Sequence, residues 1–235
     1  MRPGRPGSIF LGRPQYAAAW YAVRVRIAVC DVGLGNLRSV ERALTEAARG
    51  KRVEVEITRD PAHIAAADRL VMPGQGAFGD CARALSADLG AAVRRHLEAE
   101  RPYLGICLGL QVLFGSSEEA PGCSGLGVLA GGVVKLGGGV DPLTAAPLKI
   151  PHVGWNVATP REHGGRLALL AGPEHFYFVH SFVVAPRDPA VIAATTDYGA
   201  PFVSAIAYDN VFACQFHPEK SQRAGLALLE RFLAS

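Results

Sequence analysis

Along the first half of the chain, short apolar runs alternate with longer segments whose hydrophobic positions have helical spacing. Continuous or alternating apolar runs are typical of strands, and a spacing of three to four residues is typical of amphipathic helices. Strands are predicted at 25–30, 53–57, 69–72 and 102–106. Helices are predicted at 37–48, 79–100 and 108–114. This order favours βαβ units and a mainly parallel sheet flanked by helices.

The second half of the chain has a different pattern, because short β-rich runs follow one another. Strands are predicted at 125–136, 149–157, 176–184, 191–196, 203–208 and 211–215, before a C-terminal helix at 221–232. The glycine-rich stretch at 137–142 is interpreted as a loop and not as a domain linker, since strand signals resume at once. We therefore expect one α/β domain that covers residues 25–235.

The first 24 residues differ from the rest because they are rich in Arg, Pro and Gly. We expect a disordered leader or a segment outside the native start, with Val25 as a translation start read from an alternative codon. Removal of residues 1–24 is expected to leave activity intact. The apolar run at 16–23 is far too short to span a bilayer, so we expect neither membrane insertion nor secretion.

Composition, charge and cysteine usage fit a globular protein of the cytoplasm. The 235 residues are 49% apolar and 19% charged, and a net charge of +3 is too small to suggest nucleic-acid binding. The five cysteines, at 30, 81, 107, 123 and 214, have neither paired spacing nor the spacing of zinc ligands. We therefore expect free thiols in a reducing compartment and no metal site.

One of these cysteines, Cys107, is framed by two glycines in the sequence Gly105-Ile-Cys-Leu-Gly109. It lies where a predicted strand gives way to a predicted helix. Such a frame forces a nucleophile into a strained conformation and lets strand and helix pack closely. The helix N-terminus favours a thiolate, and the amide of Leu108 faces an oxyanion formed by attack. Alone, the pattern fits a buried structural cysteine equally well.

A second pair of titratable residues, His217 and Glu219, is separated by Pro218. In an extended segment this spacing places both side chains on one face. His217 can then take the Cys107 proton and later protonate a departing amine. Glu219 fixes the imidazole tautomer and stabilises imidazolium. The sequence therefore predicts a Cys-His-Glu triad.

Three motifs together resemble the class I, or triad, glutamine amidotransferases. They are LGICLGLQ at 104–111, FHPEKS at 216–221 and PGQGAFGD at 73–80. Within that family, GNLRSV at 35–40, PHVGWN at 151–156 and YFVHSF at 177–182 resemble the glutaminase subunits of imidazole glycerol phosphate synthase, from histidine biosynthesis. The resemblance covers about residues 27–233.

The resemblance implies a fold and a reaction. The fold is a three-layer, flavodoxin-like α/β fold with a mainly parallel central sheet and an additional, mostly antiparallel β region in the second half. The reaction is glutamine hydrolysis, in which Cys107 attacks the side-chain amide, a thioester forms, ammonia leaves and water releases glutamate. No metal or organic cofactor is implied.

The resemblance also assigns residues around the triad. The oxyanion is expected near Gln75, Gly76 and Leu108, after a peptide flip that glycines allow. Residues expected to recognise glutamine are Gln111, Glu119, His180, Ser181 and Phe182, the last three mainly through backbone. Gln75 stands where family members often carry valine, and we expect no chemical role for its side chain. The alternative role for residues 73–76 is a simple strand-ending turn. The alternatives for Gln111, Glu119 and residues 180–182 are a helix surface, a loop charge and a strand core, respectively.

A partner is implied as well, since free ammonia needs an acceptor. In the resembled enzyme a separate (β/α)₈ cyclase subunit, expected as a heterodimer with this chain, receives ammonia through an internal channel. It converts phosphoribulosyl-formimino-AICAR phosphoribonucleotide (PRFAR) to imidazole glycerol phosphate and AICAR. Positions expected at or near the interface are Asn36, Pro151, His152, Trp155, Asn156 and Lys220. Their alternative roles are turn, strand core and solvated lysine, and for Trp155 core packing competes with gating.

Three other functions compete with this hypothesis. One is a glutaminase subunit for another acceptor, in pyridoxal phosphate or anthranilate synthesis, against which GNLRSV and PHVGWN argue. Another is an α/β hydrolase with a cysteine nucleophile, which would normally place its acid before the histidine. The third is a non-catalytic module that keeps the fold, against which the intact triad argues.

Overall fold

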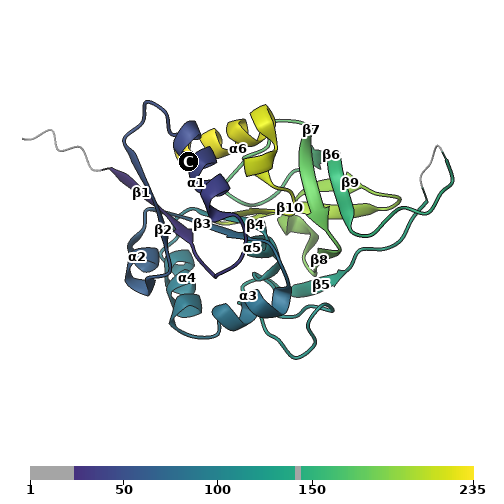
Figure 1. The fold of residues 1–235 in the computed structure, drawn as a ribbon, viewed down its shortest axis with the longest axis horizontal. Coiled ribbons are helices and arrows are strands. Elements are labelled where there is room, and N and C mark those ends of the chain that lie inside the picture. The colour runs from purple at the N-terminus through teal and green to yellow at the C-terminus, as the bar shows by residue number, and fades with distance from the viewer. Residues whose placement is uncertain (1–23, 141–143) are drawn as a thin grey trace, which may run out of the picture.

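The structure is a computed structural model that describes residues 24–140 and 144–235 (Figure 1). The predicted leader lies almost wholly outside the described residues. The strands are β1 (Val25–Cys30), β2 (Val53–Thr58), β3 (Arg69–Gly74), β4 (Tyr103–Cys107), β5 (Gly131–Lys135), β6 (His152–Pro160), β7 (Glu174–His180), β8 (Phe182–Pro186), β9 (Ile192–Asp197), β10 (Pro201–Tyr208) and β11 (Val211–Cys214). The helices are α1 (Leu37–Ala47), α2 (Pro61–Ala66), α3 (Phe78–Ala84), α4 (Asp88–Glu98), α5 (Leu108–Gln111) and α6 (Gln222–Ala234), with 3₁₀ turns η1 (Pro189–Val191) and η2 (Pro218–Lys220).

The described strands form one mixed sheet. Its main path runs β2-β1-β3-β4-β11-β10-β9-β6-β7, and β8 joins β5 to β10. The pairs among β2, β1, β3, β4 and β11 are parallel, whereas β10 pairs with β11 in the antiparallel direction, as do the later strands with one another. A parallel half from βαβ units therefore continues into an antiparallel half, as expected.

Helices cover both faces of the parallel half, which makes three layers (Figure 1). In β1, Ile27 and Val29 pack into the core that contains residues of α1 and α6. Ala28 and Cys30 pack into the opposite core, with residues of α2, α3 and α4. Successive side chains of a strand point to opposite faces, so a strand that is apolar at consecutive positions serves both cores.

Four predicted elements differ clearly from the structure, and one of them, the strand predicted at 125–136, is confined to Gly131–Lys135 (β5). The helix predicted at 79–100 is divided into α3 and α4, and Gly90 approaches the turn between them so closely that a Cβ would lie 2.0 Å from the Leu85 carbonyl oxygen. The strand predicted at 176–184 is two strands, interrupted at Ser181, that pair with different neighbours. The helix predicted at 108–114 ends at Gln111. These breaks depend on contacts distant in sequence, which periodicity does not contain.

The short helix α2 was not predicted, although its start has a local signal. Asp60 accepts a hydrogen bond from the Ala62 amide at 2.8 Å, and Pro61 occupies the first turn. Both are preferred at helix N-termini. Throughout 24–140 and 144–235, no helix has the length and apolarity needed to cross a membrane.

Candidate active site

Cys107 is the last residue of β4 and adopts a conformation that is rare for a residue with a side chain. Its φ is 55° and its ψ is −103°, and its exposed fraction is 7%. Backbone outliers of this kind cost of order 1–3 kcal/mol and gather at functional sites. The strain predicted from the glycine frame is present in the structure.

The two framing glycines are needed because three backbone segments meet there. A Cβ on Gly105 would lie 2.5 Å from the Gly109 carbonyl oxygen, and a Cβ on Gly109 would lie 1.8 Å from that of Met72. No real Cβ contact is this short. The glycines therefore let the turn after β4 lie against β3, which fixes where the Cys107 sulfur points.

The helix that follows Cys107 is shorter than predicted, so its contribution to thiolate stabilisation is smaller than expected from the sequence. α5 has only 4 residues, Leu108–Gln111. A helix dipole grows with aligned peptides, so one short turn favours the thiolate less than the predicted longer helix would. Other groups must supply most of the electrostatic support for the sulfur.

His217 and Glu219 form the predicted pair, but the backbone that joins them is not the extended segment that was expected. The His217 Nδ1 atom lies 2.8 Å from Glu219 Oε1, and the two side chains are 1% and 3% exposed. The segment from Pro218 is the 3₁₀ turn η2, not an extended strand. Tyr177 on β7 holds this turn, because its carbonyl accepts from the His217 amide at 2.9 Å and its amide donates to Ser221 Oγ at 3.0 Å.

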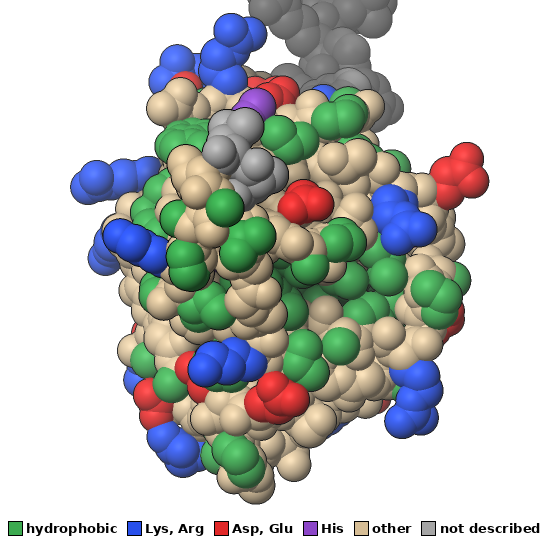
Figure 2. Space-filling view, turned by 90° about the vertical axis from the view of Figure 1, so that its right-hand side faces the viewer, with side chains coloured by type: hydrophobic (Ala, Val, Ile, Leu, Met, Phe, Trp, Pro, Cys, Tyr) green, Lys and Arg blue, Asp and Glu red, His purple; other side chains and the backbone are tan. Residues whose placement is uncertain are grey.

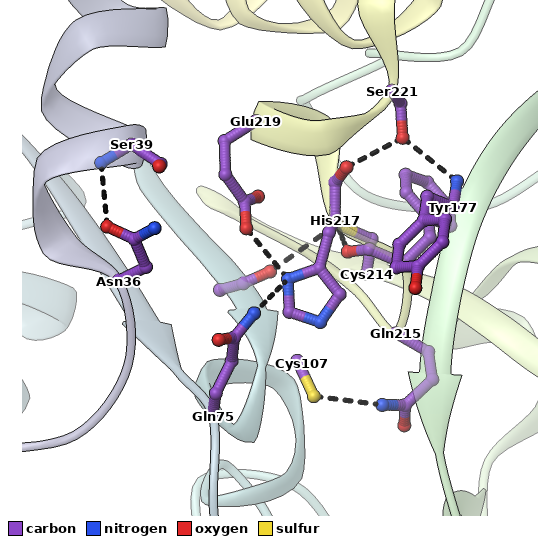
Figure 3. Close-up of polar contacts among 12 residues, drawn as sticks. Asn36, Ser39, Gln75, Cys107, Tyr177, Cys214, Gln215, His217, Glu219 and Ser221 are labelled. Carbon is purple, nitrogen blue, oxygen red and sulfur yellow. Dashed lines mark hydrogen bonds and ion pairs between the residues drawn. The ribbon is translucent and has the colours of Figure 1, made fainter. Parts of the chain in front are cut away.

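The environment of His217 favours its protonated form. Burial lowers the pKa of His217, but interactions with Cys107 and Glu219 outweigh burial and raise it to about 9. Within the described part of the chain, Nε2 has no hydrogen-bond partner, and the ring lies between Glu219 and Cys107 (Figure 3). An imidazolium at neutral pH is therefore available beside the sulfur, where it favours the thiolate and can give up a proton.

A cavity of about 350 Å³ adjoins Cys107 and gathers most of the predicted residues. Its walls include the three predicted oxyanion residues, Gln75, Gly76 and Leu108. They also include all five residues predicted to recognise glutamine, which are Gln111, Glu119, His180, Ser181 and Phe182. The cavity volume is in the range of small-molecule sites. Segments that are distant in the sequence therefore enclose one site.

The predicted recognition residues are held by contacts of their own. Glu119 Oε2 accepts from the Phe78 amide at 2.8 Å, which fixes the carboxylate at the cavity wall. Gln111 Nε2 lies 3.2 Å from the Phe182 carbonyl oxygen. His180 Nδ1 lies 3.1 Å from the same oxygen. Burial lowers the pKa of His180 to about 3, so its ring is neutral.

The side chain of Gln75 lies at the triad, a position that the sequence did not predict. Its side-chain nitrogen lies 3.3 Å from His217 Nδ1, on the side of the ring that also meets Glu219 (Figure 3). The turn between Gly74 and Gly76 points this side chain at the His-Glu pair, and the expectation that it has no chemical role stays a prediction. Backbone positions of the turn remain the ones proposed for the oxyanion.

The predicted interface residues fall into two groups. Pro151 and Lys220 line the cavity, and Trp155 is 47% exposed with its ring edge-on to Tyr177 at 6.2 Å. His152, in contrast, is 3% exposed, and its ring stacks on Tyr198 with centroids 4.0 Å apart. This burial matches the strand-core role named as the alternative for His152, whose place at or near an interface stays a prediction.

The two predicted asparagines have structural partners. Asn36 is the N-cap of α1, where its side chain accepts from the Ser39 amide at 3.2 Å. Asn156 donates to the Asp197 carbonyl at 2.8 Å. These contacts match the turn and strand roles named as alternatives.

Comparison with known proteins identifies the family. The family model described as glutamine amidotransferase class-I matches residues 28–235. The imidazole glycerol phosphate synthase subunit HisH of Aromatoleum aromaticum is 48% identical over 209 residues, which cover 88% of this chain and 97% of that protein. The chain belongs to the class-I glutamine amidotransferases, in the HisH family. HisH of Aquifex aeolicus is 47% identical and covers 88% of this chain and 96% of its own length.

Solved structures agree with the fold of this amidotransferase. The structure of PurLQS from Thermotoga maritima has a TM-score of 0.67 at 17% identity and covers 90% of this chain and 99% of that chain. A solved glutamine amidotransferase has a TM-score of 0.64 at 20% identity, with coverages of 88% and 97%. The predicted fold class is confirmed, and family membership argues against the α/β hydrolase alternative.

Sequence reasoning missed one residue of the amidotransferase site. Gln215 is fully buried, and its Nε2 atom lies 3.4 Å from Cys107 Sγ (Figure 3). The one signal in the sequence was its place as the last residue of the strand predicted at 211–215, two residues before His217. No group of three or more potential metal ligands occurs among the residues that the structure describes.

Proposed function

We propose that this chain is the glutaminase subunit of imidazole glycerol phosphate synthase, in histidine biosynthesis. It hydrolyses glutamine and passes ammonia to a separate (β/α)₈ cyclase subunit in a heterodimer. The observation that supports this most directly is Cys107 in its strained turn, with the buried His217–Glu219 pair beside it and the cavity next to it. The relatives named HisH support the pathway.

Acylation begins with attack of the Cys107 thiolate on the carboxamide carbon of glutamine. The carbonyl oxygen becomes an oxyanion, for which backbone amides near Gln75, Gly76 and Leu108 supply hydrogen bonds. The imidazolium of His217 then protonates the nitrogen, the C–N bond breaks and ammonia leaves. Glu219 stabilises the imidazolium before this step and holds the ring in place during it.

Deacylation reverses the proton flow. Neutral His217 takes a proton from water, and the resulting hydroxide attacks the thioester carbon. The second tetrahedral intermediate collapses with departure of the Cys107 thiolate, and glutamate is released. The imidazolium is restored, so the site returns to its starting protonation state.

Substrate recognition follows from charge and burial. The α-ammonium of glutamine needs an acceptor, since burying an unpaired cation costs several kcal/mol or more, by order of magnitude. Glu119 supplies a carboxylate on the cavity wall, and the Phe78 amide leaves it partly available. Gln111 and the backbone at 180–182 complete the amino-acid end of the site.

The partner is expected on the face that carries exposed apolar residues of β6. Val153 and Trp155 are 55% and 47% exposed, on the strand that follows the cavity residue Pro151. Figure 2 views the molecule from the side on which β6 and β7 lie in Figure 1, and hydrophobic side chains occur across the middle of this view, among charged ones. Val153 and Trp155 are two positions apart on one strand and so face the same side, and neighbouring exposed apolar groups favour an interaction site.

The decisive experiment is glutamate release from glutamine by the purified chain, alone and with the cyclase subunit plus PRFAR or its product. Strong stimulation by partner and ligand together is the expected result. Glutaminase activity that is indifferent to both would keep the family but assign a different acceptor, such as that of pyridoxal phosphate or anthranilate synthesis. No glutamate release under any condition would overturn the proposal.

A further inference from the structure

The side chain of Gln215 is placed against the nucleophile by the strand register. β11 runs parallel to β4, and the last paired residues are Cys214 and Ile106. The next residues along the chain are Gln215, directly after β11, and Cys107, the last residue of β4, so the two lie side by side at the carboxyl edge of the sheet. Gln215 has an exposed fraction of 0%, and its Nε2 atom lies 3.4 Å from Cys107 Sγ (Figure 3).

The orientation of the Gln215 amide follows from its other contact. Gln111 Nε2, which can only donate, lies 3.1 Å from Gln215 Oε1. Gln111 is itself oriented by the Phe182 carbonyl oxygen at 3.2 Å, which can only accept. Because a backbone carbonyl cannot exchange donor and acceptor ends, it fixes the direction of both amides. Gln215 is thereby left with an N–H group facing the sulfur.

The same carbonyl anchors a second set of buried donors. His180 Nδ1 lies 3.1 Å from the Phe182 oxygen, so Nδ1 carries the hydrogen and Nε2 is an acceptor. His152 Nδ1 lies 3.2 Å from His180 Nε2 and supplies the matching donor. Burial lowers the pKa of His152 to about 4 and that of His180 to about 3, so both rings are neutral, as this pattern requires.

A buried amide donor has a direct effect on a cysteine nucleophile. A hydrogen bond to an ionised acceptor is roughly twice as strong as one to a neutral group, so an N–H group facing Cys107 Sγ stabilises the thiolate over the thiol. Burial of Gln215 keeps water from competing for its N–H group. The same bond favours departure of the thiolate when the thioester is hydrolysed.

We propose that Gln215 is the hydrogen-bond donor that holds Cys107 Sγ and stabilises its thiolate, with its amide oriented by Gln111 and the Phe182 carbonyl. This inference deepens the proposed function and rests on Cys107 being its nucleophile. Gln215 supplies the support that the short helix α5 provides only weakly.

The test is the pH dependence of Cys107 alkylation by iodoacetamide in the full chain, followed by mass spectrometry of the peptide that contains Cys107. Gln215→Met keeps the length of the side chain and removes the donor. The midpoint of the alkylation profile is expected to move up by about one pH unit. Gln111→Met keeps the donor but frees its orientation, and an intermediate upward shift is expected.

The matched control is Ser204→Ala. Ser204 is buried, its carbonyl accepts from the Gln215 amide at 2.9 Å, and its hydroxyl has no hydrogen-bond partner among the described residues. This variant disturbs the same part of the core without changing the donor to Cys107. An unchanged midpoint is expected, and a shift equal to that of Gln215→Met would overturn the inference.

A measurement on the unsubstituted chain covers the case in which Gln215→Met does not fold. The side-chain ¹⁵N resonance of Gln215 is followed against pH, with Cys107→Ala as the reference. The resonance is expected to titrate with the midpoint of Cys107 alkylation and to lose that titration in Cys107→Ala. A Gln215 resonance indifferent to Cys107 would overturn the inference.

Alkylation requires neither glutamine turnover nor a partner, so the two proposals can fail separately. Glutamate release that persists with an unshifted midpoint in Gln215→Met would remove the role of Gln215 and keep the glutaminase. A shifted midpoint in a chain that releases no glutamate would keep the role of Gln215 and overturn the proposed glutaminase function. In an active chain, Gln215→Met is expected to lower kcat roughly tenfold with little change in KM.

Discussion

The Nδ1 atom of His217 lies 2.8 Å from Oε1 of Glu219, and the 3₁₀ turn at Pro218–Lys220 makes this contact between residues only two positions apart. Both side chains are almost fully buried. Water therefore competes little with the carboxylate, and the charge of Glu219 acts on the imidazole at close range. The protonation of His217 is the property that this pair controls.

Glu219→Gln keeps the shape of the side chain and removes its charge, so the pKa of His217 is expected to fall below about 9, although the contribution of Cys107 remains. The imidazolium is then lost at lower pH. The alkaline decline of glutamate release should move to lower pH, and kcat should fall roughly a hundredfold. The exposed Glu230→Gln on α6 is the matched control, and identical pH profiles for the two variants would contradict this role of Glu219.

Cys107→Ala removes the nucleophile and is expected to abolish glutamine-dependent synthesis by the complex. Ammonia-dependent synthesis by the partner should persist, because only ammonia generation is lost. Both rates are measured on the complex with either nitrogen source. Cys123→Ala, at a partly exposed cysteine outside the cavity, should retain both. Glutamine-dependent turnover in Cys107→Ala would reject the assignment of the nucleophile.

Gly109→Ala places a Cβ where the Met72 carbonyl oxygen would be 1.8 Å away, so β3 and the turn after β4 must separate. We expect a loss of about 3 kcal/mol in the free energy of unfolding, measured with denaturant. Glutaminase activity should fall as well, because the Cys107 turn moves. Gly172→Ala, where nothing lies within 4 Å of the added Cβ, should change stability by less than about 1 kcal/mol. Equal losses of stability in the two variants would contradict the importance of the close approach between Gly109 and the Met72 carbonyl.

Trp155→Ala tests the apolar face of β6. Central aromatic residues of interfaces often contribute about 2 kcal/mol or more, so we expect the dissociation constant for the cyclase subunit to rise by roughly thirtyfold. Basal glutaminase activity of the free chain should be retained. Tyr208→Ala removes another exposed aromatic residue, 43% exposed at the end of β10, and should leave binding unchanged. Equal binding by both variants would place the partner elsewhere.

The buried pair His152 and His180 predicts that stability falls with acidification. Their pKa values are lowered from 6.5 to about 4 and about 3, so the unfolded chain binds more protons than the folded chain below pH 6.5. Stability should therefore decrease from pH 6.5 to pH 4, at about 1.4 kcal/mol per histidine and pH unit once the unfolded histidines are protonated.

Denaturant unfolding at several pH values checks this prediction against His152→Phe. Phenylalanine can stack between Phe178 and Tyr198 as the imidazole does, but it does not titrate. The variant should be less stable at pH 7, since His180 Nε2 loses its donor, and its stability should depend less on pH. An unchanged slope between pH 6.5 and 4 would contradict the buried neutral pair.

Local sequence alone determined most of the elements and the three groups of the triad. The apolar runs predicted most strands, because a strand buried on both faces needs consecutive apolar residues whatever its neighbours are. The Gly105 and Gly109 frame predicted the strained Cys107 turn, since the close approach is encoded within five residues. The spacing of His217 and Glu219 predicted their contact, although its 3₁₀ backbone was not foreseen.

Only the tertiary structure decided which distant groups meet. Gln215 reaches Cys107 because β11 lies beside β4 in one register, and Gln75 reaches His217 because β3 ends next to that site. His152 is buried because its strand packs its ring against Tyr198, which the alternation of β6 does not reveal. The order of strands and their register are set by packing of the whole chain, so contacts that depend on them are absent from any single stretch of sequence.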